Sequence, residues 1–496
     1  MITTRDGTAD VRFIRSQQRG RHHSEMARAA SAASPAAAAA RRRDRGGVAA
    51  TASALLRRFG DPNDVAIASF VARVLVVLDA LLSVAIVRRV AYTNIDWNAY
   101  MGEARGYASG ERDYAKLRGD TGPLVYPAGF LYLYDALRRV TDDGADVRRA
   151  QMIFVVVYAA HQAAAMAVTV KARVVPPWAL SLLCVSKRIH SVFALRMFND
   201  GVCSLVAWVA IWLAQSKRFV AAAVALSVAA SVKMNALLFL PPFLVLLVGH
   251  ERVSTACVAV GAFVGVQVVV GWPFLSTYPR EYVGRAFELG RKFTYEWTVN
   301  WKFVSIETFS SDAFSLGLLL AHVAILFAFA HARWYRRGGG FFPAFFVDFF
   351  ERARTDAAAS KRLKSLTAAD VVCAMAEGNF IGIVFARSLH YQFYAWYFHS
   401  LPLLLWSISS NGSRRGGKGG GRLRRALAVA ARVGAMGAIE WCWNVYPSTP
   451  TSSLVLFATH AALLLSLWLG GVGIPSGGRR RSRGGVKRAR SKKKLG

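Results

Sequence analysis

The chain has 496 residues, of which 54% are hydrophobic, and it carries a formal net charge of +34. This combination excludes an ordinary soluble enzyme, a disordered chain and a disulfide scaffold. High apolar content and high positive charge are compatible when apolar and basic blocks are separated along the chain. The five cysteines are scattered and form no CxxC pair, so neither a zinc ribbon nor a thioredoxin motif is indicated.

The positive charge is concentrated in three segments rich in Gly, Ala or Ser. Residues 1–60 contain 12 Arg against 4 acidic residues, and residues 477–496 contain 10 Lys or Arg and no acid. Residues 411–425 add 6 basic residues. Beside membrane spans, such segments mark the cytosolic side and contact anionic lipid headgroups. We therefore expect membrane lipids, and no nucleic acid, as partners.

Apolar stretches near bilayer length, about 20 residues each, fill the chain between Val65 and Gly471. We expect spans near 65–87, 150–170, 176–195, 200–214, 219–232, 236–249, 253–275, 313–330, 370–388, 392–409, 426–446 and 453–471. This pattern predicts an all-α polytopic membrane protein with about 10–13 transmembrane helices. The expected domains are a basic extension, a transmembrane domain and a basic tail, at 1–64, 65–472 and 473–496.

The orientation follows from the loops. If the basic start lies in the cytosol, every even-numbered span returns there, and most basic loops and both termini are cytosolic, as the positive-inside rule requires. Two long loops, 88–149 and 276–312, then lie on the far side. Their aromatic residues suit amphipathic helices in the membrane interface.

The first long loop alternates aromatic residues such as Trp97 and Tyr126 with acids. Asp96 lies a few residues after the first span, where a carboxylate can act as a general base toward a hydroxyl held at the interface. A helix cap or a solvated acid is the alternative. Asp120 lies in the turn sequence Gly-Asp-Thr-Gly-Pro, so it either shapes the turn or contacts a ligand.

Polar residues inside apolar stretches are candidates for function because they are expensive in a membrane. Arg188 falls in the third span, and Arg387 and His390 lie at the end of the ninth. Arg and His together can bind a phosphate. The alternative is internal ion pairing between spans, for example of Arg387 with Glu377.

The second long loop contains the sequence TYEWTVNWKF, with Trp297 and Asn300. Indoles there stack on sugar faces or only anchor the loop, and the sequence leaves both open. Acids and aromatics thus face one aqueous side, and basic residues lie at membrane depth near it. This arrangement suits an enzyme whose substrate combines a lipid tail, an anionic headgroup and a sugar.

Five segments resemble one family, in order: IDWNAYM, GDTGPLVYPAGF, SKRIHSVFALRMFND, EWTVNWKF and FARSLHYQFYAWYFHSLP. It is the dolichyl-phosphate-mannose-dependent α-1,3-mannosyltransferase family of the N-glycan precursor pathway, the asparagine-linked glycosylation protein three family. The resemblance runs from about Tyr92 to Trp468. Lys302 stands where the family pattern has Arg, which weakens any bidentate role there.

The resemblance implies a GT-C-type membrane glycosyltransferase. It implies transfer of mannose from dolichyl phosphate mannose to the five-mannose dolichyl-diphosphate-linked oligosaccharide, with inversion, in the endoplasmic reticulum lumen. Asp96 is then the base, and Arg387, His390 and Arg188 bind the donor phosphate. Residues expected to bind the sugar acceptor are Trp97, Asp120, Tyr126, Trp297, Asn300 and Tyr391. Because dolichyl phosphate leaves already ionised, neither a metal nor a cofactor is expected.

Two alternatives stay open at this point. The chain resembles, more distantly, dolichyl-phosphate-mannose-dependent mannosyltransferases with another linkage or a glycolipid-anchor acceptor. A lipid or sugar transporter would instead gather its polar residues midway through paired broken helices. An enzyme predicts that the two long loops and the end of the ninth span surround one cavity.

The orientation is tested by Asn411, which begins the sequence Asn-Gly-Ser, a glycosylation acceptor motif. Because we place residues 411–425 in the cytosol, we expect Asn411 to carry no glycan. Glycosidase treatment followed by peptide mass spectrometry checks this. A glycan mapped to Asn411 would reverse the orientation of the neighbouring spans.

Overall fold

The computed structural model describes residues 53–288, 290, 294–335, 365–408 and 420–470. Contacts divide the chain into two units, Met1–Asp61 and Pro62–Gly496. In the first unit the described part is a helix over residues 53–59 and the turn that follows it. The domain limits expected from the sequence stay predictions, because most of the extension and the tail lie outside the described residues.

Helices make up almost all the regular structure of the described part of the second unit. The α-helices are α3 (Val65–Arg89), α4 (Trp97–Ala108), α5 (Ala128–Val140), α6 (Val147–Ala172), α7 (Lys187–His190), α8 (Asn199–Gln215), α9 (Phe219–Val232), α10 (Leu240–His250), α11 (Val253–Leu275), α12 (Pro279–Ala286), α13 (Ile306–Ser310), α14 (Asp312–Phe329), α17 (Ala368–Val384), α18 (Leu401–Ser407), α19 (Gly420–Asn444) and α20 (Pro450–Gly470). Shorter 3-10 or π-helical turns are η1 (Pro177–Cys184), η2 (Ser191–Leu195), η3 (Met234–Phe239), η4 (Ala330–Trp334), η5 (Tyr391–Trp396) and η6 (Phe398–Ser400). The described strands are β1 (Arg118–Gly119) and β2 (Gly122–Pro123), which pair antiparallel.

Five helices among the described residues are long and apolar enough to cross a membrane: α3, α6, α11, α14 continued by η4, and α20. A sixth span results if η1 and the α7–η2 segment, bent by 52°, count as one. The chain is therefore a multi-pass membrane protein, but this measure gives fewer spans than the expected 10–13. The helices α8, α9, α10 and α17 occupy expected spans yet have 17 residues or fewer. Hydropathy alone does not separate a helix that crosses lipid from one that ends inside the protein.

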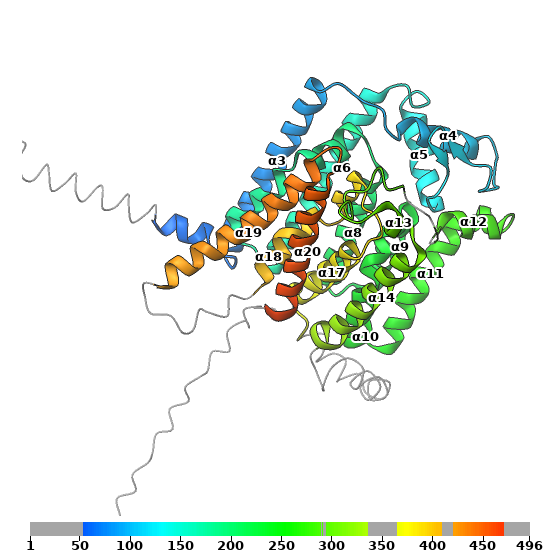
Figure 1. The fold of residues 1–496 in the computed structure, drawn as a ribbon. Coiled ribbons are helices and arrows are strands. Elements are labelled where there is room, and N and C mark those ends of the chain that lie inside the picture. Colours follow the sequence, from blue (N-terminus) through cyan, green and yellow to red (C-terminus); the bar gives the residue numbers. More distant parts are fainter. Residues whose placement is uncertain (1–52, 289, 291–293, 336–364, 409–419, 471–496) are drawn as a thin grey trace, which may run out of the picture. The chain divides into compact units, whose positions relative to one another are not determined.

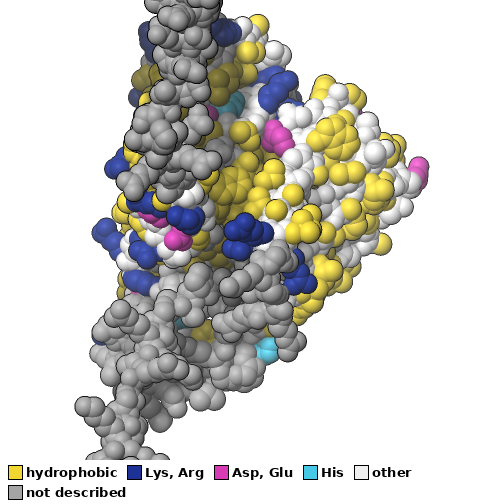
Figure 2. Space-filling view, turned by 90° about the vertical axis from the view of Figure 1, so that its left-hand side faces the viewer, with side chains coloured by type: hydrophobic (Ala, Val, Ile, Leu, Met, Phe, Trp, Pro, Cys, Tyr) yellow, Lys and Arg dark blue, Asp and Glu magenta, His cyan; other side chains and the backbone are white. Residues whose placement is uncertain are grey.

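The membrane-spanning helices differ in how much surface they leave exposed. Only 6% of the apolar window of α11 is buried, and only 17% of that of α14. Exposed apolar surface of this extent is typical of contact with lipid. On the face in Figure 2, hydrophobic side chains likewise cover much of the described surface and acidic side chains are sparse.

Two of the expected spans are broken rather than continuous. The stretch 176–195 forms η1, α7 and η2, and the stretch 392–409 forms η5, η6 and α18. In the second stretch, Pro402 lies in the first turn of α18 and cannot donate a backbone hydrogen bond to the preceding turn. Broken helices at membrane depth are tolerated where they line a cavity or pack on protein.

Neighbouring helices form a packed row in the order α3, α6, α8, α9 and α11 (Figure 1). Helix α17 packs against α6, α8, α10 and α14, and almost all its residues are buried. Its start is fixed by a capping box between Thr367 and Asp370. The segment that follows α17 is thereby held in the interior of the helix assembly.

The first long loop is folded and not a flexible connection. Helices α4 and α5 pack against each other. The hairpin of β1 and β2 lies between them in the sequence. Gly119 lies so close to α4 that a Cβ would be 2.5 Å from the Cα of Ala99. Rings of Tyr100, Phe130 and Tyr134 contact one another between the two helices. This packing fixes the start of α4, where Asp96 lies.

Candidate active site

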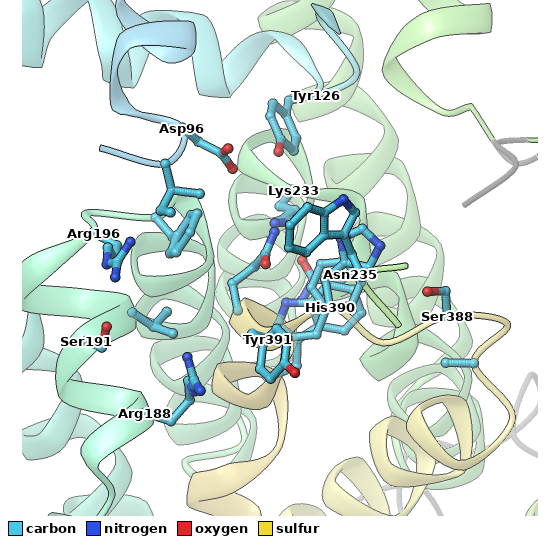
Figure 3. Close-up of a pocket in the computed structure, with 18 of the residues that line it drawn as sticks. Asp96, Tyr126, Arg188, Ser191, Arg196, Lys233, Asn235, Ser388, His390 and Tyr391 are labelled. Carbon is cyan, nitrogen blue, oxygen red and sulfur yellow. The ribbon is translucent and has the colours of Figure 1, made fainter. Parts of the chain in front are cut away.

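A cavity of about 2060 Å³ opens among the described helices. It is larger than the roughly 300–1,000 Å³ of a typical small-molecule pocket. Its walls come from α3, α4, the hairpin, α7, η2, the junction of α9 and η3, the second long loop, α14 and the segment after α17. Figure 3 shows the polar side chains converging on it from several of these elements. The two long loops and the end of the ninth expected span therefore meet around one cavity.

Seven of the ten residues chosen from the sequence line this cavity: Asp96, Tyr126, Arg188, Trp297, Arg387, His390 and Tyr391. Trp97, Asp120 and Asn300 do not line it. Whether any of the ten contacts a substrate stays a prediction.

Asp96 occupies the N-cap position of α4, but its side chain makes no capping hydrogen bond. Instead, its Oδ2 atom accepts a long hydrogen bond of 3.3 Å from the hydroxyl of Tyr100. Burial raises the pKa of Asp96 above its ordinary value, and the positive charge of Lys233 opposes this shift. This carboxylate therefore does not cap α4, which was the alternative that the sequence left open.

The face of α4 that carries Asp96 also presents Tyr100 and Glu103 to the cavity. Positions four and seven residues apart share one side of a helix, so these three residues form a row. The Glu103 side chain is almost fully buried. Glu103 was not predicted from the sequence, although its spacing of seven residues from Asp96 indicated a shared helix face.

On another wall, Arg188 is oriented by two contacts. Its Nε donates to the backbone carbonyl of Trp443 at 3.1 Å, and its guanidinium lies 4.7 Å from the ring centre of Tyr391. Arg196 lies on the same side of the cavity in Figure 3 and donates to the carbonyl of Thr93. This wall is therefore positively charged without a neutralising carboxylate bonded to either guanidinium in the described residues.

Arg387 follows α17 and lines the cavity. No hydrogen bond or ion pair to Arg387 is present among the described residues, and its Nε is buried without a partner. The alternative pairing with Glu377 does not occur, because Glu377 lies 3.9 Å from Arg333 and accepts a hydrogen bond from Trp334. A half-buried guanidinium without a protein partner is a site for an anionic ligand.

The segment that carries Arg387 is clamped by the second long loop. Asn300 donates through Nδ2 to the carbonyl of Ala386 and accepts through Oδ1 from the amide of Leu389, both at 2.8 Å. The indole of Trp301 also donates to Ala386, at 2.8 Å. Asn300 therefore orients the backbone on both sides of Arg387.

Trp97 and Asp120, which do not line the cavity, lie in the first long loop, and Lys302 lies in the second. Trp97 is fully buried and donates its indole N–H to the carbonyl of Gly144 at 2.9 Å. Asp120 is exposed at the turn between β1 and β2. Lys302, which stands in place of Arg, donates to the carbonyls of Tyr295 and Glu296 within its own loop.

A further charged residue that lines the cavity, Lys233, was not selected from the sequence. Its ammonium forms an ion pair with Asp200 at 2.7 Å. The available signal was a lysine that interrupts an apolar stretch, which is expensive in a membrane unless it is paired or functional. Among the described residues, no three His, Cys, Asp or Glu side chains gather to hold a metal ion.

The residues that form the cavity also match a known protein family. The family model described as ALG3 protein matches residues 73–453. The chain belongs to this family. The resemblance found in the sequence is thereby confirmed, and the match covers both long loops and every wall of the cavity.

Curated relatives are similar over most of their length. A protein of Arabidopsis thaliana is 44% identical over 80% of this chain and 86% of the relative, and a human protein is 42% identical over 78% and 83%. A protein of Neurospora crassa is 38% identical over 82% and 88%. All three are named Dol-P-Man:Man(5)GlcNAc(2)-PP-Dol alpha-1,3-mannosyltransferase. No solved structure matches this member of the family.

The clamp on Arg387 predicts the effect of Asn300→Ala. The variant leaves the amide of Leu389 without its partner, and a buried unsatisfied group costs about 1–3 kcal/mol. We expect a lower thermal unfolding temperature and weaker activity, measured on purified protein in detergent. Asn98→Ala, at an exposed position on α4, is the control and should change stability little. Unchanged stability with a raised KM for the acceptor would instead support direct acceptor binding by Asn300.

Proposed function

We propose that this chain is an inverting GT-C-type α-1,3-mannosyltransferase of the N-glycan precursor pathway. Its donor is dolichyl phosphate mannose, and its acceptor is the five-mannose dolichyl-diphosphate-linked oligosaccharide that the relatives' names specify. The observation that carries the proposal is the shared cavity. A carboxylate that makes no capping bond, Asp96, and a guanidinium without a described partner, Arg387, both line it.

The reaction needs a base on one face of the sugar and a stabilised leaving group on the other. Asp96 accepts the proton of the acceptor hydroxyl while that oxygen forms a bond to the anomeric carbon of mannose. The bond between this carbon and the phosphate oxygen breaks, and its electron pair leaves with dolichyl phosphate. Arg387, with His390 and Arg188, stabilises the charge on the phosphate.

The cavity also suits the lipid part of both substrates. Residues of membrane-spanning helices line it, including Leu82 and Ile86 of α3 and Leu316 and Leu319 of α14. Leu82, Leu316 and Leu319 are also exposed on the protein surface. A polyprenyl chain in the bilayer can therefore reach the polar groups of the cavity without leaving an apolar environment.

For the cellular location, we place the protein in the endoplasmic reticulum membrane with the cavity facing the lumen and both termini in the cytosol. The basic loops support this orientation through the positive-inside rule. Lipid-linked donors with another acceptor, and transport without transfer, are the competing functions. The relatives' names favour the acceptor proposed here.

The proposed base is tested by Asp96→Asn. The amide keeps the size of the side chain but cannot take the proton, so the rate of mannose transfer should fall by ~10²–10⁴-fold, about 3–5 kcal/mol in the barrier. Purified variants are assayed with dolichyl phosphate mannose and the lipid-linked acceptor, both saturating. Donor binding and the unfolding temperature should change little.

Asp120→Asn is the matched comparison, since Asn also makes the turn that Asp120 occupies. We expect near-normal transfer from it. An inactive Asp120→Asn beside an active Asp96→Asn would move the base to Asp120. Full activity in both variants would remove the first long loop from the chemistry.

The proposed phosphate ligand is tested by Arg387→Lys, which keeps the charge but loses the planar fork. Because a hydrogen bond to a charged group contributes about 1.5–3 kcal/mol, use of the donor should weaken by roughly tenfold to a hundredfold. The readout is kcat/KM for donor at saturating acceptor, with the unfolding temperature measured in parallel. Unchanged kinetics for both substrates would show that the guanidinium fork is not needed.

A further inference from the structure

Lys233 lies at a break between two helices. It is the C-cap residue of α9, its backbone is extended, and η3 begins at the next residue. The side chain is only 6% exposed, yet it lines the cavity. Figure 3 shows it between Asp96 and Tyr126 on one side and His390 and Tyr391 on the other.

The ammonium group is held from behind by the first turn of α8. Its Nζ donates to Oδ2 of Asp200 at 2.7 Å and to Oδ1 of Asn199 at 3.1 Å. The indole of Trp396 donates to the other carboxylate oxygen of Asp200. Both carboxylate oxygens of Asp200 are therefore hydrogen-bonded. The position of Lys233 is fixed by its own helix, α9, and by contacts with α8 and η5.

Aromatic rings surround the rest of the ammonium. It lies 5.3 Å from the ring centres of Tyr126 and Phe393 and 5.9 Å from that of Trp396. An ammonium has three donors, of which two are bonded to Asn199 and Asp200. The side chain is thus largely shielded from solvent, and a shielded charge acts over a longer distance than one in bulk water.

Asp96 and Lys233 face each other without forming an ion pair in the described part of the chain (Figure 3). The charged groups that act on Asp96 are Lys233, Asp200 and Asp120, in decreasing order of influence. The other titratable groups that line the cavity near Asp96 are Glu103, on the same face of α4, Arg196 and several phenols. Tyr100 donates to Asp96, and Tyr92 and Tyr126 lie within electrostatic range of it. Lys233 is therefore the cation that offsets the burial of this carboxylate.

We propose that Lys233, anchored by Asp200 and Asn199, is a positioning residue that keeps the carboxylate of Asp96 ionised while leaving it free to accept a proton. A direct ion pair would also keep Asp96 ionised, but it would occupy the oxygen that must act as the base. Separation by the cavity avoids this. The inference rests on the proposed function, because it requires Asp96 to be the base.

The test is the pH dependence of mannose transfer by the full chain in detergent. Activity should rise with pH as Asp96 loses its proton. Lys233→Met removes the nearby positive charge, which raises the pKa of Asp96, so the rise should move to higher pH. Asp200→Asn removes a negative charge instead, so the rise should move to lower pH. Lys116→Met, at an exposed lysine of the first long loop, is the control and should leave it unchanged.

Stability needs separate attention, because Lys233→Met leaves Asp200 buried without its ion-pair partner. The double variant Lys233→Met with Asp200→Asn removes both charges together. Lys233 acts on Asp96 more strongly than Asp200 does. The activity of the double variant should therefore rise at a higher pH than that of the unaltered protein, but at a lower pH than that of Lys233→Met. If Lys233→Met alone fails to fold, Asp200→Asn and the double variant still decide the outcome.

If activity rises at the same pH in Asp200→Asn, in the lysine variants and in the unaltered protein, while Asp96→Asn is inactive, the role of Lys233 is overturned but the proposed base is not. An active Asp96→Asn overturns the proposed base, and with it the inference.

Discussion

A charged side chain at membrane depth must find its partners inside the protein, and the cavity depends on how this chain meets that constraint. Three interruptions of apolar helix deliver cations to the cavity. Arg188 lies in the bent segment after η1, Lys233 lies between α9 and η3, and Arg387 follows α17. Such interruptions are tolerated at membrane depth where they line a cavity or pack on protein.

The carboxylates nearby determine which of these cations remain available. Asp200 neutralises Lys233, and Glu377 is engaged by Arg333 and Trp334. Arg387 has no such partner among the described residues. This distribution leaves the guanidinium groups of Arg188, Arg196 and Arg387 without a bonded carboxylate in the described part of the chain, and the cost of these charges is offset when an anion binds.

The sequence predicted much of the fold, because apolar length and charge are local properties. The expected span 219–232 coincides with α9, and 253–275 coincides with α11. Asp96 and Arg387, which both line the cavity, were also selected, since each is a polar residue in or beside an apolar stretch. The bend at 176–195 was not predicted, because its helical turns depend on packing with distant segments.

Residues whose role depends on distant partners were the hardest to assign. Trp97 and Trp297 look alike in the sequence, but one is buried against Gly144 and the other is 44% exposed at the cavity. Asn300 forms hydrogen bonds with the backbone of Ala386 and Leu389, which are 86 and 89 positions later in the chain. Lys233 could be recognised as unusual, yet its relation to Asp96 appears only when α4 and α9 are placed together. No single-sequence pattern carries such pairings.

Two hydrogen bonds link the end of α19 and the residue after it to the cavity. Arg188 donates to the carbonyl of Trp443, 255 residues later, and the hydroxyl of Tyr391 donates to that of Val445. The last turn of α19 is thus a wall of the cavity and not an appendage. A translation product that stops shortly before Trp443 would contain Asp96, Lys233 and Arg387 and still lack the support that orients Arg188. Premature termination before Trp443 would therefore damage the reaction centre itself.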